Sequence, residues 1–343
     1  MSSEKIVACQ ICPHNCKLKP NNRGLCGTIV NREKSITDIS YGIIDMKIDF
    51  IENSGFHHFV PGHKALFLFF PGCNLKCIHC KYWIYAHRFP EDFTGFMHRR
   101  SPKEIINYAQ TNRVDTIVFM RGEPLIHYKF VKEVAKLARE NNIYTGVVSN
   151  GFINSKILEE VIPYIDAFNI QLLGTDDRPY YRLTITPQAV NNIMGTIDII
   201  FKTKKHLEIS YFVVPGLSDN IKKFKEFCLS FIKKYGNKIP LVLRRFFPYY
   251  LAEKRAPARN RIILQFWKVA KASGFSFAYV FDLFLHKSKH TYCPEDNTVL
   301  IKRYGDRIAV MPDLKNKKCR KCGYEVPIFG TLRSSIDLSI LKK

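Results

Sequence analysis

The sequence predicts an α/β protein whose strands form a mostly parallel sheet. Short apolar runs that end in turn residues alternate with segments whose apolar residues recur at helical spacing. The composition is that of a folded chain, because 46% of the 343 residues are hydrophobic and only 18 are Gly and 17 are Pro. This length suits two domains, or one barrel with appendages.

Six apolar runs are the candidate strands of this sheet. They span residues 65–70, 115–120, 143–149, 167–173, 207–214 and 241–247, and a seventh run follows at 275–283. The helical segments between them span residues 102–112, 127–141, 154–163, 187–204, 219–235 and 257–272. Alternation of this kind favours parallel strands, which need helical crossovers to connect them.

Two cysteine-bearing segments flank this core. We expect a cysteine-rich head at residues 1–60, the core at 61–286 and a cysteine-bearing tail at 287–343. The first ten residues lack an apolar signal segment, and the longest apolar stretch, at 65–70, is too short to span a membrane. We therefore expect a cytoplasmic protein without a membrane partner, whose 11 cysteines serve metal or redox chemistry rather than disulfides.

The net charge of +23 is concentrated in the second half of the chain. Residues 1–171 hold 21 basic and 16 acidic side chains, whereas residues 172–343 hold 32 and 14. Such an excess predicts an anionic partner such as RNA, although a solvated lysine-rich surface accounts for it equally well.

The loop after the first candidate strand carries three closely spaced cysteines. Cys73, Cys77 and Cys80 lie four and three residues apart, and no fourth protein ligand is close in the sequence. Three thiolates on one loop can hold three corners of an iron-sulfur cube, which leaves one iron open to a small molecule. A zinc knuckle or three unrelated buried thiols are the alternatives.

This loop resembles the CxxxCxxC signature of the radical S-adenosylmethionine (SAM) superfamily. The resemblance implies a partial (β/α)6 TIM-like barrel and a 4Fe–4S cluster whose open iron chelates SAM. One electron, from a donor such as ferredoxin or flavodoxin, then cleaves SAM to a 5'-deoxyadenosyl radical that abstracts a substrate hydrogen. Because cluster-bound SAM generates the radical, the resemblance assigns no catalytic side chain. His79 stands where many members have an aromatic residue.

Polar residues on or after the other strands are candidate cofactor contacts. They are Gly122, Glu123, Ser149, Asn150, Gln171, Glu208 and Arg245. Residues 121–124 resemble the superfamily's GGEP element, whose glycine lets the backbone approach the ligand and whose carboxylate could accept from the methionine ammonium. Ser149 and Asn150 could contact ribose hydroxyls, and the last three are polar groups in apolar runs. Each is also compatible with a turn, a helix N-terminus or a partner within the protein.

The likeness extends over nearly the whole chain. It resembles a subgroup named for the AmmeMemoRadiSam gene association, itself similar to activating enzymes of pyruvate formate-lyase. Segments that carry this likeness include 12–16, 23–27, 214–216, 245–248 and 291–294. Residues 171–173 read QLL where the subgroup usually has DLK, and Arg121 and Gly122 stand where relatives often have Tyr-Asn. An acidic or cationic group acting from the fourth strand is therefore in doubt.

The head and the tail each contain a further candidate metal site. The head has four thiols, Cys9, Cys12, Cys16 and Cys26, which suit zinc or a second Fe–S cluster, with free thiols as the alternative. The tail has Cys293, Cys319 and Cys322, with either His290 or Asp296 as a fourth zinc ligand. A degenerate ribbon without metal is the alternative there, and Cys228 is most simply a core thiol.

Three functions are consistent with these features. The first is a radical SAM oxidoreductase that abstracts hydrogen from a protein, as glycyl-radical activating enzymes do, or from an unidentified substrate. The second is a radical SAM enzyme that modifies RNA. Its basic candidates are Arg244, Arg245, Arg255, Arg259 and Arg261, and its aromatic candidates are Tyr249, Tyr250 and Trp267. The third is a non-catalytic, metal-stapled binding protein.

Overall fold

The computed structural model describes residues 6–93 and 95–336, and its centre is one large open sheet. Nine strands follow the order β13-β12-β11-β10-β9-β8-β6-β5-β7. All pairs from β6 to β13 are parallel, and β5 runs antiparallel to β6. The order ends at β13 and β7 without closing, so the predicted partial barrel is confirmed.

The predicted strands correspond closely to those of the sheet. Its strands are β5 (Ile43–Phe50), β6 (Lys64–Phe69), β7 (His98–Arg99), β8 (Thr116–Met120), β9 (Tyr144–Ser149), β10 (Ala167–Leu172), β11 (His206–Val213), β12 (Leu241–Arg245) and β13 (Ala278–Val280). β5 was not predicted, and it lies in the segment that we assigned to the head. Its apolar run is interrupted by Asp45, Lys47 and Asp49, which are tolerated because β5 lies near the sheet edge.

Helices connect the parallel strands as the sequence predicts. They are α2 (Pro102–Thr111), α3 (Tyr128–Glu140), α4 (Ser155–Val161), α6 (Ala189–Lys202), α7 (Ile221–Tyr235) and α8 (Asn260–Ala272). Two short helices, α1 (Trp83–His87) and α5 (Asp177–Thr184), were not predicted. The 3-10 helices are η1 (Ile51–Ser54), η2 (Pro90–Phe93), η3 (Pro124–His127), η4 (Ile162–Tyr164), η5 (Tyr250–Ala252) and η6 (Lys287–Lys289). α2 starts sharply, because Ser101 and Glu104 form a capping box.

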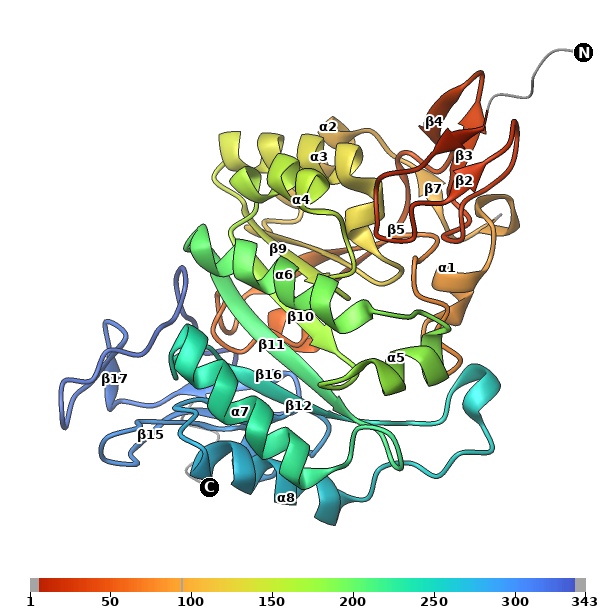
Figure 1. Ribbon diagram of the computed structural model, residues 1–343. Coiled ribbons are helices and arrows are strands. Elements are labelled where there is room, and N and C mark those ends of the chain that lie inside the picture. The colour runs from red at the N-terminus through yellow and green to blue at the C-terminus, as the bar shows by residue number, and fades with distance from the viewer. Residues whose placement is uncertain (1–5, 94, 337–343) are drawn as a thin grey trace, which may run out of the picture.

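The two faces of the sheet are covered differently. The large helices pack on the outer face (Figure 1), where α3 contributes Phe130, Val131 and Val134 to the main core. The inner face is covered at one end by residues 51–63, whose Phe56 and Phe59 pack against residues of β6, β8, β9 and β10. This segment fills the amino ends of the strands, and the carboxyl ends are left for a site.

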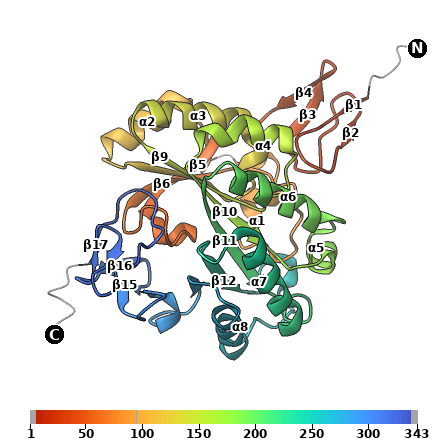
Figure 2. The ribbon, with the colours of Figure 1, turned by 60° about the vertical axis from the view of Figure 1, so that its left-hand side comes forward.

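The head and the tail lie on opposite sides of the molecule (Figures 1 and 2). The head contains two hairpins, β1 (Val7–Ala8) with β2 (Lys17–Leu18) and β3 (Ile29–Arg32) with β4 (Ser35–Asp38). The tail contains a three-stranded sheet, β14 (Thr291–Tyr292), β15 (Val299–Tyr304) and β16 (Arg307–Val310), and a hairpin, β17 (Leu314–Lys315) with β18 (Lys318–Cys319). Among the described residues, no helix has the length and apolar character needed to cross a membrane.

Candidate active site at the carboxyl ends of the strands

One cavity of about 480 Å³ lies where the parallel strands end. Ten of the eleven residues predicted for the central cluster and SAM line it: Cys73, Cys77, His79, Cys80, Gly122, Glu123, Ser149, Asn150, Gln171 and Arg245. Residues from β5 and from the segment after β13 line it as well. The fold thus brings together side chains from strand ends that lie far apart in the sequence.

The cysteine loop is held in place by hydrogen bonds to sulfur and to the backbone. Cys73 is buried and accepts from the Leu75 N–H at 3.4 Å and from Asn150 Nδ2 at 3.6 Å. Burial raises the pKa of Cys80 to about 11 and raises the pKa values of Cys73 and Cys77. These thiols are therefore protonated at neutral pH in the absence of metal, and iron binding must displace their protons.

The turn that carries Glu123 interlocks with the cysteine loop. Gly122 has φ +58°, and a Cβ atom there would lie 2.3 Å from the Phe70 carbonyl oxygen and 2.6 Å from that of Gly72. The Glu123 N–H donates to the Gly72 carbonyl at 3.0 Å. Only glycine fits at position 122, because the two carbonyl oxygens leave no room for a Cβ atom, and the positive φ adds strain for any other residue.

The Glu123 carboxylate is buried and accepts three hydrogen bonds. Oε1 accepts from the Leu125 N–H at 3.1 Å and from Ser149 Oγ at 2.8 Å, and Oε2 accepts from the Asn150 N–H at 2.9 Å. Burial raises its pKa, whereas these donors lower it. Glu123 is also the N-cap residue of η3. It therefore lines the cavity and at the same time has the ordinary structural role of a helix N-terminus.

Comparison with known proteins identifies the core. Residues 67–228 match the family described as the Radical SAM superfamily. The chain contains a radical SAM domain. Its superfamily uses a 4Fe–4S cluster and SAM, which are therefore the cofactors of this domain.

Relatives match different lengths of the chain. A Methanocaldococcus jannaschii protein described as uncharacterized is 28% identical over 325 residues, which are 94% of this chain and 95% of that protein. A putative glycyl-radical enzyme activating enzyme of the same organism is 24% identical over 164 residues, 46% of this chain and 65% of that protein. A solved domain of a pyruvate-formate lyase-activating enzyme from Bacteroides vulgatus aligns with 48% of this chain and 96% of its own, at 17% identity and a TM-score of 0.39.

Ser149 and Asn150 line the cavity and also make hydrogen bonds within the radical SAM domain. Ser149 Oγ donates to Glu123 and accepts from the Gly151 N–H at 2.9 Å. Asn150 Nδ2 donates to Asn74 Oδ1 at 2.9 Å. Both residues therefore position the carboxylate and the cysteine loop, a role that sequence reasoning did not assign to them.

His79, Gln171 and Arg245 line the cavity from three different elements. The His79 ring lies 5.4 Å from that of Phe246, and its buried Nδ1 has no hydrogen-bond partner among residues 6–93 and 95–336. Burial, with Arg255 as a secondary cause, lowers the pKa of His79 to about 4, so the ring is neutral. Arg245 Nε donates to the Ala258 carbonyl at 2.9 Å, which fixes the guanidinium against the wall.

Glu208 is not a cavity residue, and its predicted contact with the cofactor is corrected here. It lies near the amino end of β11, and its carboxylate accepts from the backbone N–H groups of His57 and His58, each at 2.8 Å. His206 Nε2 is 2.9 Å from the same carboxylate. Sequence reasoning correctly inferred that this polar group needs partners, but the partners belong to the inner segment 51–63.

Sequence reasoning missed Asn74, beside the cavity, and left the role of Arg121 open. Asn74 is fully buried, and its Nδ2 donates to the Phe152 carbonyl oxygen. Arg121 has φ +58°, and its guanidinium lies 3.7 Å from the ring centre of Phe69 and 4.2 Å from that of Tyr82. Its Nε is buried and has no hydrogen-bond partner within the described part of the chain. The sequence feature that pointed to Arg121 was its position directly before the glycine, where relatives often have a different residue.

The head brings its four cysteines into one neighbourhood. Their thiols influence one another electrostatically, and burial raises the pKa values of Cys9 and Cys12. The backbone N–H of Cys9 donates to the Cys16 carbonyl at 2.9 Å. His14 is directed elsewhere, because its Nε2 lies 2.8 Å from the Asn74 carbonyl oxygen. The head therefore contacts the central cysteine loop through a hydrogen bond.

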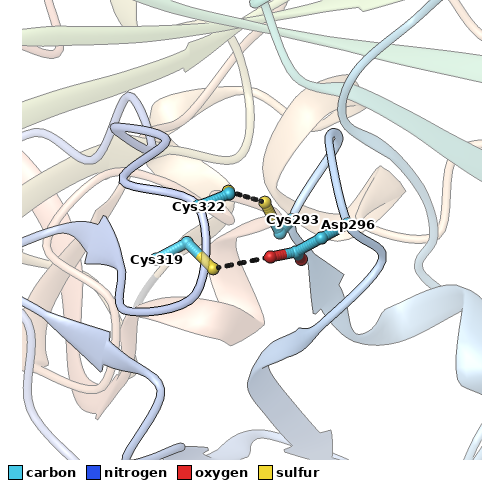
Figure 3. Close-up of side chains that lie close together, drawn as sticks. All are labelled: Cys293, Asp296, Cys319 and Cys322. Atoms are coloured by element: carbon cyan, nitrogen blue, oxygen red, sulfur yellow. Dashed lines mark hydrogen bonds between the residues drawn. The ribbon is translucent and has the colours of Figure 1, made fainter.

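The tail brings together Cys293, Asp296, Cys319 and Cys322 (Figure 3). His290, the other candidate ligand, is not part of this group, because its Nδ1 accepts from the Arg303 N–H at 3.1 Å. Cys228 is buried in α7, as expected of a core thiol.

Proposed function

We propose that this protein is a radical SAM enzyme that cleaves SAM reductively and abstracts a hydrogen atom from a protein substrate, as activating enzymes do. The observation that carries the proposal is that Cys73, Cys77 and Cys80 line the same cavity as the Glu123 turn. An external reductant such as ferredoxin or flavodoxin would supply the electron.

The residues around the cavity fit both cofactors. Three thiols would hold three irons and leave the fourth iron without a protein ligand. The unpartnered Nδ1 of His79 and Nε of Arg121 are buried polar atoms that a polar ligand would satisfy. A volume of 480 Å³ lies within the range of about 300–1,000 Å³ typical of ligand pockets. When bound, the cluster and SAM supply the electron transfer and the radical that removes hydrogen.

The chain's own residues orient the ligand by charge. Glu123 Oε2 accepts one hydrogen bond within the protein, so its second lone pair suits an ammonium group. An ammonium would also favour the ionised form of a carboxyl whose pKa burial raises. Arg121, held over Phe69 and Tyr82, would face a carboxylate without losing side-chain entropy on binding.

The open sheet supports a protein substrate. Asp49 of β5 and Asp282, which follows β13, both line the cavity, so the cavity reaches from one side of the sheet to the other. An extended peptide segment can enter a site of this shape more readily than it can enter a closed barrel. A relative described as a putative glycyl-radical enzyme activating enzyme supports the same substrate class.

The RNA alternative has less support from the arrangement of its candidate residues. Trp267 is partly buried on α8, where its Nε1 donates to the Ala278 carbonyl at 2.8 Å. Arg244, Arg245 and Tyr249 line the cavity, and Trp267 is not among its lining residues. The candidate aromatic residues are therefore divided between two places, which gives less support to a continuous stacking surface for single-stranded RNA.

The test is an anaerobic assay of 5'-deoxyadenosine from reduced, iron-loaded protein and SAM. We expect the wild type to release this product and Cys77→Ala to fall to background, because the variant lacks one cluster ligand. Cys228→Ala is the matched control: it also removes a buried thiol, but outside the cavity, and should retain activity. Equal product from wild type and Cys77→Ala would contradict the cluster assignment, and no product from any of them would favour the scaffold alternative. Deuterium transfer from a peptide labelled at glycine would test the substrate class.

A further inference from the structure

The tail contains a second group of metal-ligating atoms that the radical SAM chemistry does not use. The Sγ atoms of Cys293, Cys319 and Cys322 and a carboxylate oxygen of Asp296 all lie within 4.8 Å of one another. Figure 3 shows the two side chains of one turn facing the two of the other. Cys293 Sγ is 3.3 Å from Cys322 Sγ, and Cys319 Sγ is 3.3 Å from Asp296 Oδ2.

These separations suit one tetrahedral ion rather than a cluster. Bonds of about 2.3 Å to sulfur and about 2.1 Å to oxygen place neighbouring ligands of a zinc ion roughly 3.5–3.8 Å apart. A cube with several irons attaches each thiolate to a different iron, which spreads the ligands further. In the part of the chain that the structure describes, this is the one group of three or more such atoms that converges within 4.8 Å.

The two turns that supply the ligands have the same backbone geometry. In the first turn the Asn297 N–H donates to the Cys293 carbonyl, and the Cys293 N–H donates to the Thr298 carbonyl. In the second turn Gly323 and Tyr324 make the equivalent pair of bonds with Cys319. A residue with positive φ follows the second ligand in both, Asn297 at +59° and Gly323 at +78°. Asp296 therefore occupies the position that Cys322 occupies in the second turn.

The surroundings explain how so much negative charge is tolerated. Three thiolates and a carboxylate around a divalent ion leave a net charge of −2. Five cationic residues flank the second turn: Lys315, Lys317, Lys318, Arg320 and Lys321. They reduce the cost of gathering the anionic ligands, and they account for part of the positive charge of the second half of the chain.

We propose that Cys293, Asp296, Cys319 and Cys322 bind one zinc ion that holds the tail in its folded arrangement. Cys293 and Cys319 belong to a small core shared with Phe277 and Tyr279 of the barrel. Beyond the second turn, Phe329 makes backbone hydrogen bonds to both His58 and Val60. The ion therefore joins two turns that anchor the tail against the inner segment 51–63.

The test is the metal content of the full-length protein purified from zinc-containing medium. We expect Cys322→Ser to lose about one equivalent of zinc relative to the wild type and to keep its iron. Asp296→Cys should keep that zinc, because it completes a four-thiolate site without changing the turn. As the reciprocal control, Cys77→Ala should lower iron and leave zinc unchanged.

Cobalt substitution and proteolysis give readouts that do not depend on enzyme activity. Co²⁺ added to the metal-depleted protein should give a tetrahedral spectrum whose sulfur-to-cobalt band strengthens in Asp296→Cys and is lost in Cys322→Ser. Limited proteolysis should cleave the tail of Cys322→Ser faster than that of Asp296→Cys. Equal zinc in Cys322→Ser and wild type, loss of iron in place of zinc, or a Cys293–Cys322 disulfide in the purified wild type would overturn the proposal.

Discussion

Three buried glutamates show how local partners decide the role of a side chain. Glu52, Glu123 and Glu208 are exposed by 5%, 2% and 0% of their surface, so burial alone does not distinguish them. Glu123 is held by donors from a neighbouring strand end and faces the cavity, whereas Glu208 accepts from two backbone N–H groups of the inner segment. Glu52 accepts from the Gly62 N–H at 2.8 Å, but its other oxygen is buried and finds no hydrogen-bond partner among the residues that the structure describes.

Glu52 should make the stability of the protein depend on pH. Burial raises its pKa from 4.5 to about 7, although the Arg303 charge and the Gly62 N–H lower it. The folded state thus binds this proton more tightly than the unfolded chain, so the stability that this group contributes is fully present below pH 4.5 and is lost as pH rises through about 7. The shift corresponds to a change on the order of 3 kcal/mol in the free energy of unfolding.

We expect Glu52→Gln to remove this dependence. Thermal melts between pH 5 and 8 should show the Tm of the wild type falling relative to that of the variant as pH increases. Glu104→Gln is the control and should follow the wild type, because Glu104 is exposed and Gln can take its place in the capping box of α2. Parallel curves for wild type and Glu52→Gln would show that this carboxyl does not titrate in the range.

At the scale of elements, the site depends on two turns that fit together without space between them. The turn after β8 places Gly122 against the carbonyl oxygens of Phe70 and Gly72, which belong to the segment after β6. The N–H of Gly72 in turn donates to the Tyr85 carbonyl of α1 at 2.7 Å. A change in one turn should therefore displace the cysteine loop, even though Gly122 is not itself a metal ligand.

We expect Gly122→Ala to lose bound iron and to lower the Tm substantially. The new Cβ would have to lie 2.3 Å from a backbone oxygen, in addition to the cost of about 1–2 kcal/mol for the left-handed conformation. Gly216→Ala is the matched control, because Gly216 also has positive φ but a Cβ atom added there would meet no other atom within 4 Å. Iron content and Tm of the two variants should differ clearly, and equal losses would mean that only the backbone angle matters.

At the scale of the whole molecule, the inner segment 51–63 links the barrel to the tail. Glu208 of β11 fixes this segment at His57 and His58, and Arg303 of β15 donates to the His57 carbonyl at 2.8 Å. His58 Nε2 lies 2.6 Å from the hydroxyl of Tyr279 in β13. The residues that make these contacts do not line the cavity, although Asn53 and Ser54 of the same segment do. The contacts therefore support the fold without touching the site.

Glu208→Gln should therefore separate stability from chemistry. The side-chain amide of the new Gln would place an N–H donor against one of the backbone N–H groups of His57 and His58, which now donate to Glu208. We expect this loss of a hydrogen bond to lower the free energy of unfolding by about 2–4 kcal/mol. The yield of 5'-deoxyadenosine per bound iron should be unchanged at a temperature where the variant is folded. Glu123→Gln should show the opposite pattern, in which the yield of 5'-deoxyadenosine falls by a larger fraction than the Tm does. A loss of product without a change of Tm in Glu208→Gln would restore this residue as a cofactor contact.

The sequence alone determined the succession of strands and helices along the chain and the residues of the central loop. Apolar runs and helical periodicity are local properties, so six strands and the main helices could be predicted from them. β5 could not, because its three charged residues are tolerated only near an edge of the sheet. The short helices α1 and α5 lie in loops, where no long apolar face indicates them.

Only the tertiary structure decided what the remaining polar residues contact. Spacing placed Cys73, Cys77 and Cys80 together, because all three lie within eight residues of one loop. Glu208 and Ser149 both looked like ligand contacts in the sequence, but each has its partners in segments that are distant along the chain. In the tail, the sequence left His290 and Asp296 as equal candidates. The structure places Asp296 beside the three cysteines, whereas the His290 ring accepts a hydrogen bond from the Arg303 backbone N–H. Hydrogen-bond partners of this kind are set by packing between segments, which no local pattern encodes.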